Sequence, residues 1–177
     1  MTSPTTGGFR RGVRIGVDVG SVRVGVARTD PDGMLAVPVA TLARPKSVAA
    51  PRSDLLALVD LVADYEPLEV VVGLPLGLDG TEGLAAEAVR IYSADLRAAL
   101  GRRGLDVPIR LVDERLTTAA ATRGLRAAGR DARSGRAVID QAAAVIIVQH
   151  ALDSERSTGT PPGTLLEHAT APGEDRS

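Results

Sequence analysis

Asp18 is an acidic residue in the middle of an apolar stretch, and its position requires a physical reason. From Val13 to Gly20 the residues alternate, so that apolar side chains share one face of a strand and Asp18 shares the other face with glycines. Such a bare face leaves room for another group to approach closely. A buried carboxylate is costly unless a cation or hydrogen bonds compensate it. Asp18 therefore has either a structural partner or a chemical role.

The structural alternative is an ion pair within a hairpin. A two-residue turn at Gly20-Ser21 predicts a second strand from Val22 to Arg28. In this register Asp18 faces Arg23 on the second strand. Such a pair contributes at most about 1 kcal/mol, and it leaves the glycines unexplained. The hairpin alone favours a chemical role and leaves the ion pair open.

Two further acids occupy positions where a ligand could bind. Glu114 follows a predicted strand, Val107 to Val112, at its carboxyl end, where α/β sheets place their ligand crevices. Asp140 lies in the last predicted helix, on the face that should pack on the sheet through Ala144, Ile147 and Ala151. Each also has an ordinary explanation, as a loop carboxylate or as an acid stabilised by the helix dipole.

If the three acids meet, their mutual repulsion calls for a metal ion. Two carboxylates 4 Å apart repel by roughly 4 kcal/mol at an effective dielectric constant of 20. Carboxylates alone favour a hard cation, Mg²⁺ or Mn²⁺, over zinc. Two such ions about 3.5–4 Å apart could activate water and stabilise the leaving oxygen of a phosphodiester. This chemistry requires no histidine base, and the only histidines are His150 at a helix end and His168 in an expected tail.

Arginine is concentrated between residues 102 and 136, where all nine basic side chains are arginines. Arginine matches phosphate geometry, so this segment fits a nucleic-acid partner. The alternative is a solvated face or a coding bias, because the chain has 20 arginines and a single lysine, Lys46. The predicted phosphate contacts are Arg115, Arg123, Arg126, Arg133 and Arg136.

The order of the predicted elements indicates the fold class. Three strands are followed by alternating helices and strands and finally by two helices, which predicts a three-layer α/β domain with a mixed five-stranded sheet and helices on both faces. The strands are expected near residues 13–20, 22–28, 34–42, 69–73 and 107–112, and the helices near 53–66, 80–103, 117–129 and 136–153.

Composition sets the boundaries of this domain and its compartment. A chain of 177 residues is most simply one domain, here expected at 13–154, with disordered tails at 1–12 and 155–177. The chain has no cysteine, and no apolar run is long enough to cross a membrane. The sequence therefore predicts a cytoplasmic protein without a membrane partner.

Four segments resemble a known family. They are GVDVGSVRVGVA (16–27), VVGLPLGLDGTE (71–82), DERLTT (113–118) and AVIDQAAAVIIVQ (137–149). They are similar in order and content to the YqgF/RuvX family of the ribonuclease H-like superfamily, small bacterial proteins classed as pre-16S rRNA nucleases. The resemblance implies a ribonuclease H-like fold and places the catalytic, metal-binding acids at Asp18, Glu114 and Asp140.

The same resemblance identifies residues that shape the site. Glycines of the first segment and the loop at 73–81 match the family's motifs. The expected site-shaping residues are Gly16, Gly20, Gly25, Gly73, Pro75, Asp79, Gly80, Thr81 and Thr117.

The leading hypothesis is a Mg²⁺- or Mn²⁺-dependent nuclease that processes the 5′ end of pre-16S rRNA in ribosome biogenesis. A Holliday-junction resolvase acting on branched DNA is the first alternative, and it would need a homodimer rather than a monomer to cut two strands symmetrically. A second alternative is a non-catalytic, nucleic-acid-binding assembly factor. An actin- or hexokinase-like phosphotransferase also opens with an Asp-x-Gly hairpin, but it pairs two such domains and this chain is long enough for only one.

Overall fold

A computed structural model of the protein describes residues 8–47, 49–117 and 133–167. Its elements are β1 (Arg14–Val19), β2 (Arg23–Thr29), β3 (Ala36–Ala43), α1 (Ser53–Tyr65), β4 (Glu69–Leu74), α2 (Leu84–Arg102), β5 (Ile109–Asp113), the 3₁₀ turn η1 (Glu114–Leu116), α4 (Arg133–Thr158) and β6 (Thr164–Leu165). The helix expected near 117–129 lies outside the described residues.

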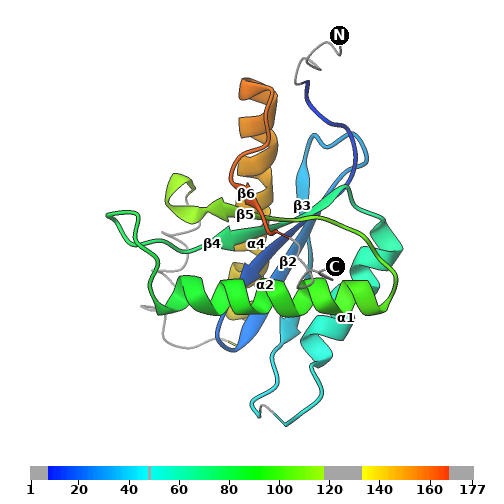
Figure 1. Ribbon diagram of the computed structural model, residues 1–177, viewed down its shortest axis with the longest axis vertical. Coiled ribbons are helices and arrows are strands. Elements are labelled where there is room, and N and C mark those ends of the chain that lie inside the picture. Colours follow the sequence, from blue (N-terminus) through cyan, green and yellow to red (C-terminus); the bar gives the residue numbers. More distant parts are fainter. Residues whose placement is uncertain (1–7, 48, 118–132, 168–177) are drawn as a thin grey trace, which may run out of the picture.

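The strands form one mixed sheet in the order β3-β2-β1-β4-β5-β6 (Figure 1). β1 pairs antiparallel with β2 and parallel with β4, and β4 pairs parallel with β5. The mixed sheet was predicted, but it has six strands where we expected five. The additional strand is β6, which pairs antiparallel with β5 over only two residues. Its pattern is too short to predict from sequence.

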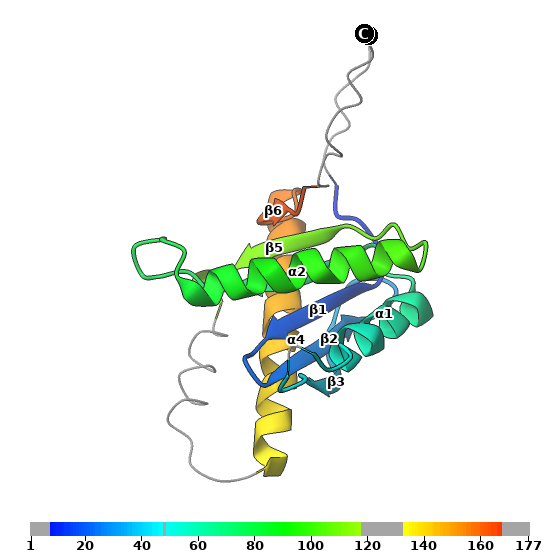
Figure 2. The ribbon, with the colours of Figure 1, turned by 60° about the horizontal axis from the view of Figure 1, so that its bottom comes forward.

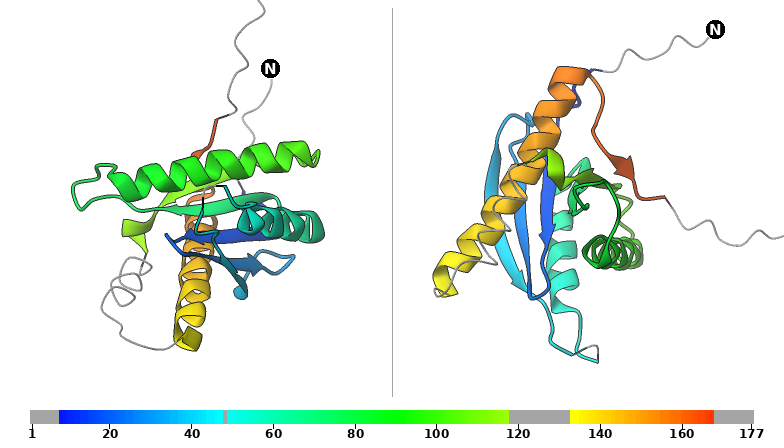
Figure 3. Two further views of the ribbon diagram at one scale, coloured as in Figure 1. Left: turned by 90° about the horizontal axis from the view of Figure 1, so that it is seen from below. Right: turned by 90° about the vertical axis from the view of Figure 1, so that its left-hand side faces the viewer.

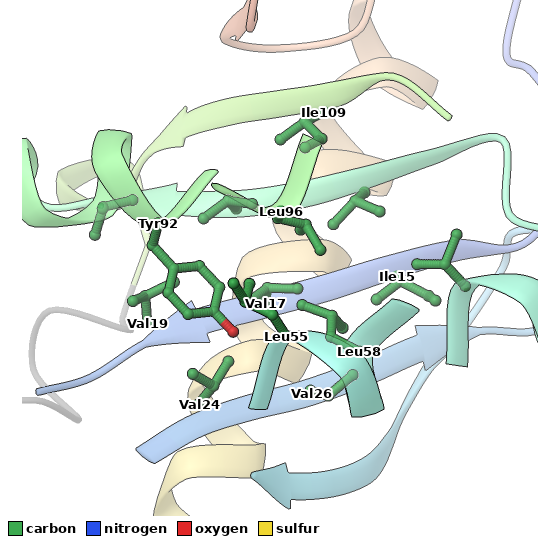
Figure 4. Packing of buried hydrophobic residues seen from close by; sticks show 14 of the residues in the cluster. Ile15, Val17, Val19, Val24, Val26, Leu55, Leu58, Tyr92, Leu96 and Ile109 are labelled. Atoms are coloured by element: carbon green, nitrogen blue, oxygen red, sulfur yellow. The ribbon is translucent and has the colours of Figure 1, made fainter. Parts of the chain in front are cut away.

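Helices cover both faces of the sheet, as predicted. Figure 3 shows α4 on one side of the sheet and α1 and α2 on the other. Between the sheet and α1 and α2 lies an aliphatic core that includes Ile15, Val17, Leu58 and Leu96 around the buried Tyr92 (Figure 4). Alternation along β1 thus directs its apolar side chains to this core and turns Asp18 towards α4. None of the helices in the described ranges is long and apolar enough to cross a membrane.

The β1–β2 hairpin differs from the expected register. Its turn lies one residue later, at Ser21–Val22, where the Gly20 N–H donates to the Arg23 carbonyl. Asp18 therefore pairs with Gly25 rather than with Arg23. Moving the turn by one residue shifts every cross-strand partner by two, which leaves each side chain on its expected face. Periodicity could not distinguish the two registers for this reason, and the predicted cross-strand Asp18–Arg23 pair is wrong.

The chain beyond residue 154 continues the fold, so the disordered tail expected from 155 is wrong as far as residue 167. Helix α4 extends to Thr158, and the following residues return along the sheet to form β6. The Leu166 N–H donates to the Ile109 carbonyl and extends this pairing by one residue. Residues 168–177 are outside the described part of the chain.

A cluster of buried charges lies where β1 and β4 begin, and we name it the Arg–Glu cluster. Glu155 of α4 accepts from Arg10 (Nε to Oε1, 2.7 Å) and from Arg14 (Nη2 to Oε2, 2.8 Å). Glu69 accepts from Arg10 and from Arg110, at 2.9 and 3.0 Å. Residues 8–12 were expected to belong to a tail, but Arg10 fastens this segment to both carboxylates.

The Arg–Glu cluster makes stability depend on acid pH. Burial alone would raise the pKa of Glu155, but hydrogen bonds from Arg10 and the charge of Arg14 outweigh burial, and the pKa of this carboxyl is lowered. A lowered pKa adds stability above the ordinary Glu value of about 4.3, and this stability is lost as pH falls through the folded-state pKa. We expect the free energy of unfolding to fall below about pH 4.5, and to fall less steeply in Glu155→Gln. Urea titrations between pH 7 and pH 3 measure both slopes; equal slopes would contradict the assignment.

Candidate active site

Four loops meet at one edge of the sheet because of the strand directions. β1, β4 and β5 are mutually parallel, and β3 runs in the same direction because it is antiparallel to β2. Their carboxyl ends therefore lie at a common edge, which we call the carboxyl edge. The segments that leave this edge are the β1–β2 turn, the β3–α1 loop, the β4–α2 loop and η1.

Asp18 lies near this edge between two glycines on neighbouring strands. It pairs directly with Gly25 of β2. On the other side Val17 pairs with Val72 of β4, so that Gly73 is the next residue along β4. The Asp18 side chain is 1% exposed. The space on each side of Asp18 is thus bounded by a residue without a side chain.

Gly25 brings Asp140 towards Asp18. A Cβ atom at Gly25 would collide with the carbonyl oxygen of Asp140, so the α4 backbone rests directly on β2 at this point. Two residues before Asp18 on β1, a Cβ at Gly16 would meet the Ala144 carbonyl oxygen at 2.7 Å. Helix α4 therefore covers the glycine face, which we had expected to be open to a ligand. These two glycines admit a helix, and that helix carries a buried carboxylate.

Gly73 leaves room for the Glu114 side chain, as Gly25 leaves room for the α4 backbone. A Cβ at Gly73 would collide with Glu114 Oε1 and would approach Ile147 Cδ1 of α4 to 2.6 Å. Glu114 opens η1 directly after β5 and is 2% exposed. The Thr117 hydroxyl and N–H donate to the Glu114 carbonyl oxygen at 2.8 and 2.9 Å, which closes this turn. Glu114 and Asp140 thus approach Asp18 from opposite sides.

Because α4 contacts Gly25 so closely, adding one methyl group at this position should strongly affect both stability and activity. Gly25→Ala would force α4 away from β2 and displace Asp140. We expect a loss of about 1–3 kcal/mol in stability from overpacking, and roughly a hundredfold loss of activity if the carboxylate moves by about 1 Å. Thermal unfolding and cleavage rates measure the two effects separately. Gly101→Ala is the matched control, because a Cβ at Gly101 would have no atom within 4 Å. A fully active Gly25→Ala would show that α4 does not need this close contact.

Arg23 contacts one of the acids, though not the one expected. Its guanidinium lies 3.8 Å from Asp140 Oδ2, across the sheet–helix contact. Arg44, at the start of the β3–α1 loop, donates to the Gly20 carbonyl oxygen at 2.8 Å and lies 3.9 Å from Asp54. Lys46 is exposed in the same loop. The density of arginine along the chain does not indicate these basic groups, because their position at the carboxyl edge depends on the direction of β3.

Hydrogen bonds hold the β4–α2 loop in a defined shape. The Gly77 N–H donates to the Thr81 carbonyl oxygen, and Gly80 adopts a positive φ of 85° that glycine tolerates. Asp79 accepts from the Thr81 hydroxyl at 2.7 Å and from the Thr81 N–H at 3.1 Å. These hydrogen bonds lower the pKa of Asp79, so it is ionised at neutral pH. Asp79, Gly80 and Thr81 therefore give the loop a defined shape, and their role in shaping the active site stays a prediction.

Arg115 links this loop to the site. It donates to both carboxylate oxygens of Asp113, the shortest contact being 2.7 Å, and reaches the carbonyl oxygens of Gly77 and Leu78 at 3.3 Å. Hydrogen bonding to Arg115 lowers the pKa of Asp113, so that this pair is charged at neutral pH. Arg115 thus holds the loop against η1, and its predicted phosphate contact stays a prediction.

The remaining predicted phosphate ligands are not described. Arg123 and Arg126 lie outside the described residues, and so do the side chains of Arg133 and Arg136 at the start of α4. Within the described residues, no three acidic or histidine side chains are grouped closely enough to hold a metal ion. The chemistry of the donor set, three buried carboxylates, nevertheless fits a hard divalent cation.

A sequence model of the RuvX family, described as a Holliday junction resolvase, matches residues 12–154. The chain belongs to the RuvX family. The matched segment contains all three buried carboxylates and both glycines that admit α4. The family resemblance seen in the four sequence segments is confirmed.

RuvX relatives and a solved structure agree with this assignment. A protein of Streptomyces coelicolor named "Putative pre-16S rRNA nuclease" is 54% identical over 159 residues, covering 90% of each chain. A Streptomyces avermitilis protein of the same name is 52% identical over 160 residues, covering 90% of this chain and 97% of the relative. The structure of T. thermophilus RuvC in complex with Holliday junction substrate has a TM-score of 0.52 at 16% identity, covering 85% of this chain and 98% of that chain. This likeness confirms the ribonuclease H-like fold.

Proposed function

We propose that this RuvX protein is a divalent-metal-dependent nuclease that hydrolyses phosphodiester bonds during maturation of the 5′ end of pre-16S rRNA. The observation that carries the proposal is the placement of Asp18, Glu114 and Asp140 on three elements that glycine contacts bring to one edge of the sheet. Such an arrangement is a poor source of stability, because three carboxylates repel one another in a buried site. The names of the Streptomyces relatives support pre-rRNA as the substrate.

The three carboxylates would hold Mg²⁺ or Mn²⁺. Bound there, the cations would supply an activated water and stabilise the charge on the leaving oxygen of a phosphodiester. Asp18 is the central ligand in this proposal because it lies between the other two acids on the rigid strand β1. Glu114 is oriented by its turn, and Asp140 by the contact of α4 with Gly25.

Basic side chains at the carboxyl edge would position the substrate backbone. Arg23, Arg44 and Lys46 are the described candidates, and we retain Arg115, Arg123, Arg126, Arg133 and Arg136 from the sequence as further phosphate contacts. Contacts of this kind bind phosphates without reading sequence, and their affinity falls with salt. With pre-rRNA as its substrate, the protein would act in the cytoplasm.

A Holliday-junction resolvase is the second candidate, and the description of the RuvX family favours it. Cutting two strands symmetrically would require two active sites and therefore a homodimer. A non-catalytic assembly factor is less well supported, because binding phosphate gains nothing from three buried acids nearby.

The experiment that tests the proposal compares substrates directly. Purified protein is incubated with a pre-16S rRNA fragment spanning the mature 5′ end and, in parallel, with a four-way DNA junction. Each reaction is run with Mg²⁺, with Mn²⁺ and with a chelator, and the ends are mapped. Cleavage of the RNA near the mature end supports the proposal, whereas symmetric cleavage of the junction by a dimer supports the alternative. Absence of any metal-dependent cleavage would contradict both.

A further inference from the structure

Several of the protein's exposed apolar side chains lie at the carboxyl edge. Leu78, in the β4–α2 loop, is fully exposed, and Leu116 in η1 and Val22 in the β1–β2 turn are each more than half exposed. Figure 2 shows the β4–α2 loop projecting beyond the sheet, where it connects β4 to the start of α2. Isolated exposed leucines are common on protein surfaces, so exposure alone implies nothing. The polar contacts that fix the backbone of this loop do indicate a role for Leu78.

The loop presents Leu78 on a preorganised backbone. Three features fix the residues around it: the bridge between Leu76 and Glu82, the Asp79–Thr81 hydrogen bonds, and the Arg115 contact to the Leu78 carbonyl oxygen. The backbone of Leu78 is therefore tied to the residue that follows Glu114. Leu78 is fully exposed, yet polar contacts of the neighbouring residues fix the backbone at this tip of the loop.

We propose that Leu78 is a wedge that enters the base stack of the bound strand next to the cleavage site. This inference rests on the proposed function. Apolar side chains inserted between base steps unstack them and bend the strand, and unstacked bases are what proteins recognise in structured RNA. The ligand of Leu78 would be an unstacked nucleobase at an end, a bulge or a branch of the nucleic acid. Leu78 would thus direct cleavage towards such sites and away from regular duplex.

Fluorescence of 2-aminopurine tests the wedge independently of cleavage. The probe base is placed beside the mapped cleavage position, in the RNA fragment in one arm and in the four-way junction in the other, and binding is measured in an Asp18→Asn background that leaves the substrate intact. We expect fluorescence to rise on binding and this rise to be lost in Asp18→Asn/Leu78→Ala. Leu78→Met should preserve it, because an apolar side chain of similar size can also enter between the bases. The substrate whose fluorescence rises, the RNA fragment or the four-way junction, identifies the nucleic acid that supplies the base.

Cleavage provides the second readout. In the catalytically intact protein, Leu78→Ala should lower kcat/KM about five- to tenfold, the effect of losing part of the buried apolar surface of one leucine side chain. Leu35→Ala is the matched control, because Leu35 is also more than half exposed and lies in the β2–β3 turn at the opposite end of the sheet.

Two results would overturn the wedge. One is a Leu78→Ala variant with unchanged fluorescence and cleavage. The other is a Leu78→Ala variant that changes the oligomeric state, which would make Leu78 a contact between copies. If the wild-type protein cleaves and Leu78→Ala behaves identically, only the wedge fails. If the wild type neither binds nor cleaves either substrate, the proposed function fails with it.

Discussion

Asp18→Asn is expected to reduce metal-dependent cleavage about a thousandfold while leaving the protein folded. The substitution keeps the shape of the side chain and removes a full negative charge from the centre of the acidic site. Loss of metal-assisted charge stabilisation worth roughly 4 kcal/mol corresponds to about three orders of magnitude in rate. Single-turnover cleavage of the pre-16S fragment at saturating Mg²⁺ measures the effect.

A matched substitution separates this effect from a general change of charge. Asp32→Asn makes the same chemical change at an exposed position in the β2–β3 turn, at the opposite end of the sheet, and should retain wild-type activity. Thermal unfolding checks that both variants are folded. If Asp18→Asn keeps more than a tenth of the wild-type rate, Asp18 is not a central metal ligand.

Glu155→Ala is expected to cost about 3–5 kcal/mol in the free energy of unfolding, the range measured when one partner of a buried ion pair is removed. The variant would leave Arg14, which is completely buried, without its 2.8 Å partner. It would also remove one of the two carboxylates that hold Arg10, which contacts Glu155 through both its side chain and its backbone N–H and would keep only Glu69. For a chain of this size, the loss corresponds to a fall in Tm of roughly 10 °C.

An exposed ion pair provides the comparison. Arg103 donates to Asp60 at 2.9 Å on the surface, and Arg103→Ala should cost less than about 1 kcal/mol because water screens such pairs. Chemical denaturation of both variants at pH 7 measures the difference. Equal losses would show that the Arg–Glu cluster contributes no more than a surface contact.

The two predictions concern regions near opposite ends of helix α4: Asp18 pairs with Gly25, against which Asp140 rests, and Glu155 belongs to the Arg–Glu cluster. Glu155 and Asp140 are separated along α4 by ~22 Å, from the rise of 1.5 Å per residue. Glu155 fastens α4 where β1 and β4 begin, and Asp140 lies where Gly25 admits the helix backbone. Separate positions allow stability and chemistry to be tested with little cross-effect.

The sequence by itself determined the features that depend on local pattern. Alternation along residues 13–20 predicted a strand with Asp18 on the face opposite the aliphatic core. The apolar spacing after Asp140 predicted the helix face, Ala144, Ile147 and Ala151, that packs on the sheet. The predicted strand at 107–112 placed Glu114 at the carboxyl end of that strand. Residues within one element share a period, so their faces can be read from the sequence.

Only the tertiary structure decided which elements touch. The β1–β2 register, the α4 backbone on Gly16 and Gly25, and Arg115 bound to the β4–α2 loop all depend on packing that no local period encodes. The Arg–Glu cluster is the clearest case, because Arg10 and Glu155 are 145 positions apart. The glycines beside Asp18 appeared in sequence as space for a ligand. In the structure that space is filled by a helix, and this helix brings Asp140 to the site.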